Sequence, residues 1–275
     1  MRQLIVDSSC ELNDGMIKSM DVSIVPFKIT MDGTEFIDNE NLDIEDFLNT
    51  MENSKDAIRT ACPSPDDFFR CMNGDEIFIV TLTSQLSGTY QSAMIAKEMY
   101  FEKNPNAKVH VFDSMSATSG ETGIALIIEN LNEQNKSFEE IVEYVESQKE
   151  SSITLIALSS LTNLARNGRI PKIAGKLSRI LNIKMIARNK EGKITPLSIE
   201  RGIKKTINSL VKKCKELGSA GAKYAIVISQ ANAIDAAIEL KNKLLEIFPD
   251  RIVEITQMKG LSSTYAEEGG VVVFL

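Results

Sequence analysis

Residues 77–102 read IFIVTLTSQLSGTYQSAMIAKEMYFE. They contain the strand–loop–helix pattern from which the fold class is predicted. The first six residues form an apolar run rich in isoleucine and valine, which predicts a buried β-strand. A polar loop, Thr83-Ser84-Gln85-Leu86-Ser87-Gly88, follows this run, and the longer segment 89–102 predicts a helix. A strand that passes through a short loop into a helix is the repeating unit of α/β proteins.

The same alternation extends over nearly the whole chain and predicts mostly parallel sheets covered by helices. A length of 275 residues favours two domains. The polar stretch near residues 149–152 predicts a boundary between an N-terminal α/β domain, residues 1–150, and a C-terminal α/β domain, residues 151–275. Further strands are predicted at 3–7, 22–29, 109–112, 153–158, 184–188, 193–199, 224–229, 251–256 and 270–275, and helices at 44–51, 65–72, 116–132, 138–148, 161–165, 173–181, 203–217 and 233–247.

Composition narrows the class of protein. The net charge is −7 and the pI about 5.1, which argues against a nucleic-acid-binding protein. The four cysteines form neither a C-x-x-C pair nor a disulfide-dense pattern, so we expect free thiols in a reducing compartment. No apolar stretch has the length of a signal peptide or a membrane span. We therefore expect a cytoplasmic protein without stable membrane insertion.

The usual catalytic signatures are missing from the sequence. The chain has one histidine, His110, and it falls inside a predicted strand rather than at a strand end, where a site would lie. No P-loop, G-x-G-x-x-G, H-E-x-x-H or EF-hand pattern occurs, and no Cys/His cluster has zinc spacing. The sequence therefore predicts neither a metal nor a cofactor, and no enzyme of the common hydrolytic, redox or kinase types.

Three predicted strand ends carry hydroxyl groups, and ligands of open α/β sheets bind at such ends. These ends are Asp7-Ser8-Ser9, the loop 83–89 and Asp113-Ser114-Met115-Ser116. In the second, Ser87 and the first N–H groups of the following helix can hold one anion, although Ser87 can equally act as a simple helix cap. A carboxylate held by neutral hydroxyls and amides suits a ligand with an apolar tail.

A basic segment is the other unusual feature of the sequence. Residues 151–190 contain no acidic residue. On an acidic chain this asymmetry indicates either a docking face for an acidic partner or phosphate-bearing ligand, or a solvated helix face. The cations of the segment are Arg166, Arg169, Lys172, Lys176, Arg179, Lys184, Arg188 and Lys190.

Seven motifs follow one another along the chain: Val6-Asp7-Ser8-Ser9, Thr60 with Pro63-Ser64, Thr83 through Ala93, Phe112-Asp113-Ser114, Asn167-Gly168-Arg169-Ile170, Leu181-Asn182-Ile183-Lys184 and Arg201-Gly202. In this order they resemble the DegV family of bacterial fatty-acid-binding proteins. The resemblance implies two α/β domains that bury a long-chain fatty acid between them, a carrier rather than an enzyme. It further implies a dihydroxyacetone-kinase-like partner that phosphorylates the bound fatty acid to an acyl phosphate for phospholipid synthesis.

The resemblance also assigns roles to individual residues. The fatty-acid carboxylate is expected at Thr60, Ser87 and Gly88, and Arg169 and Arg201 are expected to contact the partner or a phosphate. Near the C-terminus, Ser263 and Thr264 align with a histidine–threonine pair of the family and are expected at the carboxylate as well.

Three further positions depart from the family pattern. Ala61 replaces a serine, a loss worth roughly 1 kcal/mol of binding. Glu267 and Glu268 replace a glycine-rich segment and would repel a carboxylate or an acyl phosphate if they faced it.

Two other functions stay open at this point. One is an enzyme that acts on a small acid or phosphate ligand through Ser87 or Asp113 together with Arg169, which would need a general base nearby. The other is a lipid-responsive interaction protein whose basic face binds a partner. The sequence fixes neither the length and saturation of the acyl chain nor the oligomeric state.

Overall fold

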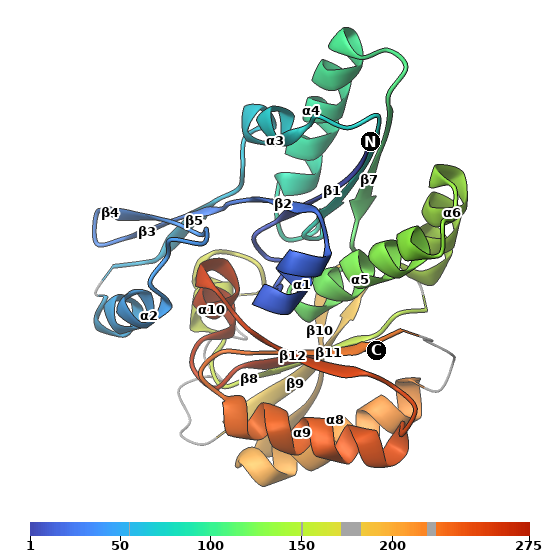
Figure 1. Cartoon of the computed structure of the whole chain (residues 1–275). Coiled ribbons are helices and arrows are strands. Elements are labelled where there is room, and N and C mark those ends of the chain that lie inside the picture. Colours follow the sequence, from blue (N-terminus) through green and yellow to red (C-terminus); the bar gives the residue numbers. More distant parts are fainter. Residues whose placement is uncertain (55, 150, 172–182, 219–223) are drawn as a thin grey trace.

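The computed structural model describes residues 1–54, 56–149, 151–171, 183–218 and 224–275. The helix predicted at 173–181 and the cations Lys172, Lys176 and Arg179 lie outside the described residues. Two sheets organise the rest of the chain, one built by the first half of the sequence and one by the second (Figure 1).

The first sheet is parallel throughout, as the sequence predicts. Its four strands lie in the order β2-β1-β6-β7. Because parallel strands point the same way, their carboxyl ends meet along one edge, and the three hydroxyl-rich segments lie there together. The strands are β1 (Arg2–Asp7), β2 (Val22–Val25), β6 (Glu76–Thr81) and β7 (Lys108–Asp113).

Helices cover both faces of this sheet. Helices α3 (Pro65–Cys71) and α4 (Thr89–Lys103) pack on the face of Ile5, Ile77 and Ile79. Ser64 and Pro65 start α3 as predicted: the Ser64 hydroxyl accepts from the Asp67 N–H at 3.2 Å, and Pro65 occupies the first turn. The opposite face carries α1 (Asp14–Ser19), α5 (Ser119–Glu133) and α6 (Phe138–Lys149).

A small antiparallel sheet with its own helix extends from this domain. The sequence predicted one strand over 22–29, but Pro26 has no N–H to continue the ladder, and the chain breaks there into β2 and β3. Neither β4, β5 nor α1 was predicted. The elements are β3 (Lys28–Met31), β4 (Thr34–Ile37), α2 (Ile44–Asn53) and β5 (Arg59–Ala61).

The second sheet has six strands in the order β10-β9-β8-β13-β11-β12. The prediction of mostly parallel strands does not hold here: β11–β12 is the parallel pair, and the other four pairs are antiparallel. The cause is a hairpin between β9 and β10 and the return of the C-terminal strand β13 between β8 and β11. The strands are β8 (Thr154–Leu158), β9 (Ile183–Lys190), β10 (Lys193–Arg201), β11 (Ile226–Gln230), β12 (Val253–Gln257) and β13 (Val271–Phe274).

The two faces of the second sheet differ in what covers them. Helices α8 (Ile203–Leu217) and α9 (Ile234–Ile247) cover the outer face and bury an aliphatic core (Figure 1). The inner face, toward the first domain, meets the short helices α7 (Thr162–Arg166) and α10 (Gly260–Ala266). This inner face is where space is left for a ligand.

Helix α5 connects the two halves of the molecule. It packs on the first sheet through Ile124, Ile127 and Ile128, and the same cluster contains Val227 and Phe274 of the second sheet. Gly123 makes this contact possible, because a Cβ at that position would lie 2.1 Å from the Phe274 ring. The two domains therefore share one core at α5.

All four cysteines are free, in agreement with the sequence-based expectation. Among the residues that the structure describes, no helix is both long enough and apolar enough to cross a membrane.

Candidate functional site

A cavity of about 350 Å³ lies between the domains, at the carboxyl edge of the first sheet and the inner face of the second. Exposed residues Ala61, Cys62 and Gly88 stand at its mouth. Its deep part is aliphatic. The apolar lining residues are Phe27, Leu82, Leu86, Ala117, Ile156, Leu158, Leu164, Ile194, Leu261, Ala266 and Val272.

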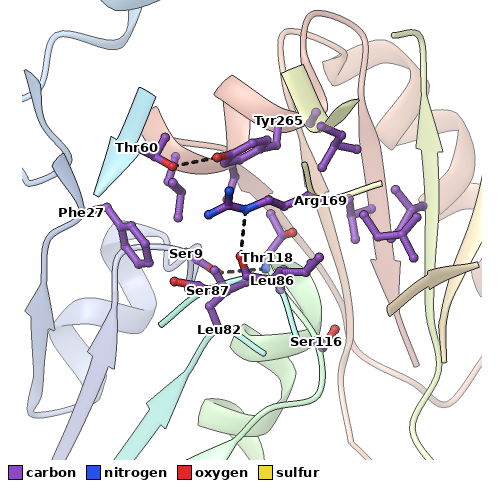
Figure 2. A pocket seen from close by; sticks show the side chains of 18 of the residues that line it. Ser9, Phe27, Thr60, Leu82, Leu86, Ser87, Ser116, Thr118, Arg169 and Tyr265 are labelled. Atoms are coloured by element: carbon purple, nitrogen blue, oxygen red, sulfur yellow. Dashed lines mark hydrogen bonds between the residues drawn. The ribbon is translucent and has the colours of Figure 1, made fainter. Parts of the chain in front are cut away.

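Thr60 and Tyr265 face each other across one end of the cavity (Figure 2). Thr60 comes from β5 of the small sheet and Tyr265 from α10 in the second half of the chain. Their hydroxyl oxygens are 2.7 Å apart and share a hydrogen bond. Both hydroxyls retain acceptor or donor capacity for a further partner.

Ser87 and Gly88 form the start of α4 beside this pair. The Ser87 hydroxyl accepts from the Thr89 N–H at 3.3 Å, and no side chain caps the helix through Gly88. Asp7 at the end of β1 holds this loop, because its carboxylate accepts from the Leu82 N–H at 2.9 Å and the Thr89 hydroxyl at 3.1 Å. The loop thus presents a hydroxyl and a helix N-terminus to the cavity.

Arg169 contributes the positive charge of the cavity lining. After α7, Gly168 adopts φ +74° and ends the helix, which turns the chain so that Arg169 faces the first domain. The Arg169 Nε donates to the Leu86 carbonyl at 2.9 Å (Figure 2). Its Nη1 donates to the Asn167 carbonyl at 2.5 Å. The guanidinium therefore links the two domains beside Ser87.

Helix α10 places a different pair of residues in the cavity from the pair predicted. The Ser263 hydroxyl donates to the Met258 carbonyl at 3.0 Å, and the Thr264 hydroxyl donates to the Gly260 carbonyl at 2.8 Å. Both residues are fully buried within the helix packing and do not line the cavity. Ser262 and Tyr265 line it instead. Ser263 and Thr264 were predicted at the ligand carboxylate, but the residue of this helix that reaches Thr60 is Tyr265.

The N-terminus of α10 is held by buried carboxylates of the first domain. Asp38 accepts from the Gly260 N–H at 2.8 Å, the Leu261 N–H at 2.9 Å and the Ser8 hydroxyl at 2.8 Å. Glu11 accepts from the Lys259 N–H at 3.0 Å. This arrangement was not predicted, because buried carboxylates have no local sequence pattern.

Burial raises the pKa values of the carboxyl groups around β1. The pKa of Asp7 rises to about 6, although hydrogen bonds from Leu82, Ser9 and Thr89 oppose the rise. Burial raises the pKa of Glu11 to about 8, and the nearby Asp38 charge adds to the effect. Burial and the Asp7 charge raise the pKa of Glu121, whose Oε2 accepts from the Ser9 hydroxyl at 2.6 Å.

Ser9 and Thr118 line the cavity floor and were not predicted as site residues. The Thr118 N–H donates to the Ser9 hydroxyl at 3.4 Å (Figure 2). Thr118 has φ +55°, an unfavourable conformation for a β-branched residue. The Asp7-Ser8-Ser9 motif pointed to this strand end, but Thr118 carried no such signal.

Arg201 and the two acidic residues near the C-terminus lie elsewhere. Arg201 is the exposed last residue of β10 and does not line the cavity, so the structure does not bring it together with Arg169 there. Glu267 accepts from the Asn163 N–H at 3.2 Å, and Glu268 accepts from the Asn232 side chain at 3.0 Å. Both line a separate cleft, so they do not face the cavity.

No general base accompanies the candidate nucleophiles in the described part of the chain. The Asp113 carboxylate accepts from the Ser84 and Met115 N–H groups, at 3.2 and 3.0 Å, and organises two loops. His110 lies on β7 with its Nε2 3.0 Å from Glu146, away from the cavity lining. Across the described ranges, no group of three or more His, Cys, Asp or Glu side chains could hold a metal ion. The apolar lining, together with the hydroxyls and Arg169 of the cavity, is suited to binding an amphipathic acid.

Comparison with known sequences identifies relatives over the full length. The model of the uncharacterised DegV protein family matches residues 2–275. A DegV domain-containing protein of Streptococcus pneumoniae is 36% identical over 278 residues, covering 98% of this chain and 97% of the relative. One from Streptococcus pyogenes is 32% identical over 275 residues, covering 98% of each.

Solved structures give the same result. A DegV family protein from Eubacterium eligens loaded with heptadecanoic acid has a TM-score of 0.94 and 32% identity, covering 100% of this chain and 99% of that one. The Streptococcus pneumoniae fatty acid kinase B3 protein loaded with linoleic acid has a TM-score of 0.92 and 33% identity, covering 100% and 98%. Both similarities extend over the two domains and the region between them.

Proposed function

The chain belongs to the DegV family, and we propose on this basis that it binds a long-chain fatty acid in the cavity between its domains. The acyl chain occupies the aliphatic part, and the carboxylate meets Thr60, Ser87 and the start of α4 at Gly88. The observation that carries the proposal is an apolar cavity whose one end combines these hydroxyls with Arg169. Two relatives whose structures contain fatty acids support it.

Most of the binding free energy should come from burial of the acyl tail. Each methylene that leaves water is worth about 0.8 kcal/mol, so a long acyl chain outweighs the head-group hydrogen bonds, each worth about 1 kcal/mol net. The hydroxyls and Arg169 then fix the orientation of the acid. In this arrangement Tyr265 and Ser262, rather than the helix-bound hydroxyls of Ser263 and Thr264, lie within reach of the ligand.

We further propose that the protein presents the carboxylate to a partner kinase for acyl-phosphate formation. The mouth at Ala61, Cys62 and Gly88 is exposed, which leaves the head group accessible from outside. The similarity to the fatty acid kinase B3 protein supports this role. Arg169 is suited to contact a phosphate at the mouth, and the exposed Arg201 is suited to contact a partner away from it.

Titration of delipidated protein with a long-chain fatty acid and with its methyl ester tests the binding proposal. The acid should bind more tightly than the ester, and Ser87→Ala should reduce this preference about fivefold, for about 1 kcal/mol. Ser84→Ala is the matched control, because Ser84 lies in the same loop but outside the cavity lining. Equal affinity for acid and ester in all three proteins would reject the head-group assignment.

Incubation of the protein with a fatty acid distinguishes a carrier from an enzyme. The ligand extracted after prolonged incubation with the protein alone should be chemically unchanged, because Ser87 has no hydrogen-bonded base among the described residues. Addition of a dihydroxyacetone-kinase-like kinase with ATP should convert the ligand to an acyl phosphate. Conversion without the kinase would favour the enzyme alternative.

A further inference from the structure

Three described residues line both the ligand cavity and a second cavity of about 680 Å³: Ser116, Thr154 and Asn189. They form a wall between the two spaces. The far side of the wall is strongly polar, since the second cavity is lined by charged residues that include Glu146, Lys149, Arg188 and Lys190. The near side is the aliphatic part of the ligand cavity.

We infer that the Ser116–Thr154 pair closes the acyl site at its tail end and so sets the length of fatty acid that binds. This inference rests on the proposed function and adds to it the feature that determines specificity. The two hydroxyl oxygens are 2.8 Å apart and hydrogen-bonded, and the residues are 6% and 4% exposed.

Both members of the pair are held in place by backbone contacts. The Ser116 N–H donates to the Ser114 hydroxyl at 3.1 Å, and the Ser116 carbonyl accepts from the Thr83 N–H at 2.8 Å. Thr154 begins β8 and is paired with Phe274 of β13. The wall therefore joins a loop of the first domain to a strand of the second, and neither side is free to swing away.

Gly120 shows how closely α5 approaches the pair. A Cβ at this position would lie 1.9 Å from the Ser116 Oγ and 2.5 Å from the Thr154 Oγ1. The first turn of α5 thus backs the hydroxyl pair directly, and the backbone leaves no space for a methyl group. The wall is packed rather than loosely covered.

The sheet places this wall at the end opposite the head group. Residues alternate between faces along a strand, so Leu158, Ile156 and Thr154 of β8 lie in a row on one face, and all three line the cavity. Leu158 belongs to the cluster on which Tyr265 packs. Thr154 lies four positions before Leu158 on the strand, a rise of about 13 Å. Figure 2 shows Ser116 at the far end of the cavity from Thr60 and Tyr265.

The polarity of the wall favours an acyl chain whose methyl end stops there. A methyl terminus gains transfer energy among aliphatic side chains but gains none beside paired hydroxyls and charges. Asn189 completes the polar wall, because its amide donates to the Met115 carbonyl and its buried Oδ1 has no partner among the residues that the structure describes. An acyl chain that extended further would have to break the Ser116–Thr154 hydrogen bond without replacing it.

A chain-length series on the delipidated wild-type protein gives the first test. Saturated fatty acids from dodecanoic to docosanoic acid should gain about fourfold in affinity per added methylene until the tail reaches the wall, and then stop gaining. A steady gain up to docosanoic acid would overturn the inference while leaving the proposed function intact. No binding of any length would reject the proposed function itself.

The double variant Ser116→Ala/Thr154→Ala gives the second test. It removes both hydroxyls and opens the wall, so the length at which the gain stops should increase by about two carbons, a rise of about 15-fold in affinity for the longer acid. Ser152→Ala is the control, because Ser152 lines the second cavity only. An unchanged length limit in a double variant that still binds the shorter acids would overturn the inference. Thr154→Val, which keeps the volume of the side chain, serves if the double variant does not fold, and should raise affinity for the first acid beyond the limit.

Discussion

Tyr265 makes the hydrogen bond that joins the two halves of the chain at one end of the cavity. Its hydroxyl is 2.7 Å from that of Thr60, and it joins a helix of the second domain to a strand of the small sheet. Thr60 has one hydroxyl hydrogen, so its partner decides where that hydrogen points. When the Tyr265 hydroxyl donates to the Thr60 oxygen, the Thr60 hydrogen stays free to donate to a ligand carboxylate.

Tyr265→Phe should therefore weaken fatty-acid binding about fivefold, for about 1 kcal/mol, without altering the fold. The measurement is a titration of delipidated protein with one fatty acid. Tyr90→Phe should bind like the wild type, because Tyr90 lies on α4, packs against the core between that helix and the first sheet, and does not line the cavity. A Tyr265→Phe protein with wild-type affinity would show that this contact does not orient the head-group site.

Glu11 makes stability depend on pH. Its pKa is about 8 in the folded protein, against an ordinary value of 4.5, so the folded state binds more protons than the unfolded state between these values. For this group the free energy of unfolding should therefore be highest at and below about pH 4.5 and fall as the pH rises toward 8, by at most about 1.4 kcal/mol per pH unit.

Denaturant unfolding at several pH values checks this expectation. Glu11→Gln should flatten the fall in stability between pH 5 and 8, because the amide cannot lose a proton. Glu45→Gln, an exposed change at the start of α2, should leave the slope as it is. A steeper or equal slope in Glu11→Gln would mean that Glu11 is charged in the folded protein at neutral pH.

At the level of elements, helix α10 decides whether the cavity is formed. It has seven residues, too few to be stable alone. Its sequence also lacks the signals by which a helix is predicted: a capping box, an apolar period, a charge pattern and a proline at its start. Its N-terminus is instead held by Asp38, which is distant in sequence and 1% exposed.

Asp38→Ala should leave three donors without their acceptor and lower the free energy of unfolding by about 3 kcal/mol. Hydrogen exchange should speed up at Gly260 and Leu261, whose N–H groups lose their partner. Asp43→Ala is a matched control: it removes the cap of α2, should cost about 1 kcal/mol, and should leave α10 exchange unchanged. Equal exchange of α10 in both variants would contradict the role of Asp38.

The elements that sequence analysis found are those with a long periodic pattern or a strong cap. Helix α8 begins and ends at the predicted residues, and Ser64 with Pro65 marks the start of α3. The elements it missed are short and depend on tertiary contacts, such as α1 and β5. The antiparallel order of the second sheet was missed for the same reason, since strand direction follows from the path of the whole chain.

The same division applies to the site. The cavity is lined by four residues that were predicted at the site: Thr60, Ser87, Gly88 and Arg169. They could be predicted because each belongs to a local sequence motif. Ser263 and Thr264 do not line the cavity, because the face of a seven-residue helix that turns inward is set by Asp38 and Glu11 rather than by the helix itself. The role of each residue toward a ligand stays a prediction.

For the whole molecule, the shared core at α5 means that the domains should not unfold separately. Phe274 of β13 packs in the same cluster as Phe78 and Phe112 of the first sheet. Phe274→Ala should cost about 3–5 kcal/mol and should still give a single unfolding transition. Ile238→Ala, at a half-exposed position on the outer face of α9, should cost far less. Two separate transitions would show that residues 1–150 and 151–275 behave as independent domains.

Mass spectrometry of the bound ligand can show whether this protein carries a fatty acid between its domains. Protein purified under native conditions is denatured, and the released ligand is identified and counted against the polypeptide. We predict one long-chain fatty acid per chain, chemically unmodified, and a wild-type length distribution that ends where the Ser116–Thr154 wall stops the tail. Protein that releases no lipid, and that binds none when fatty acid is added, would show that it is not a fatty-acid carrier.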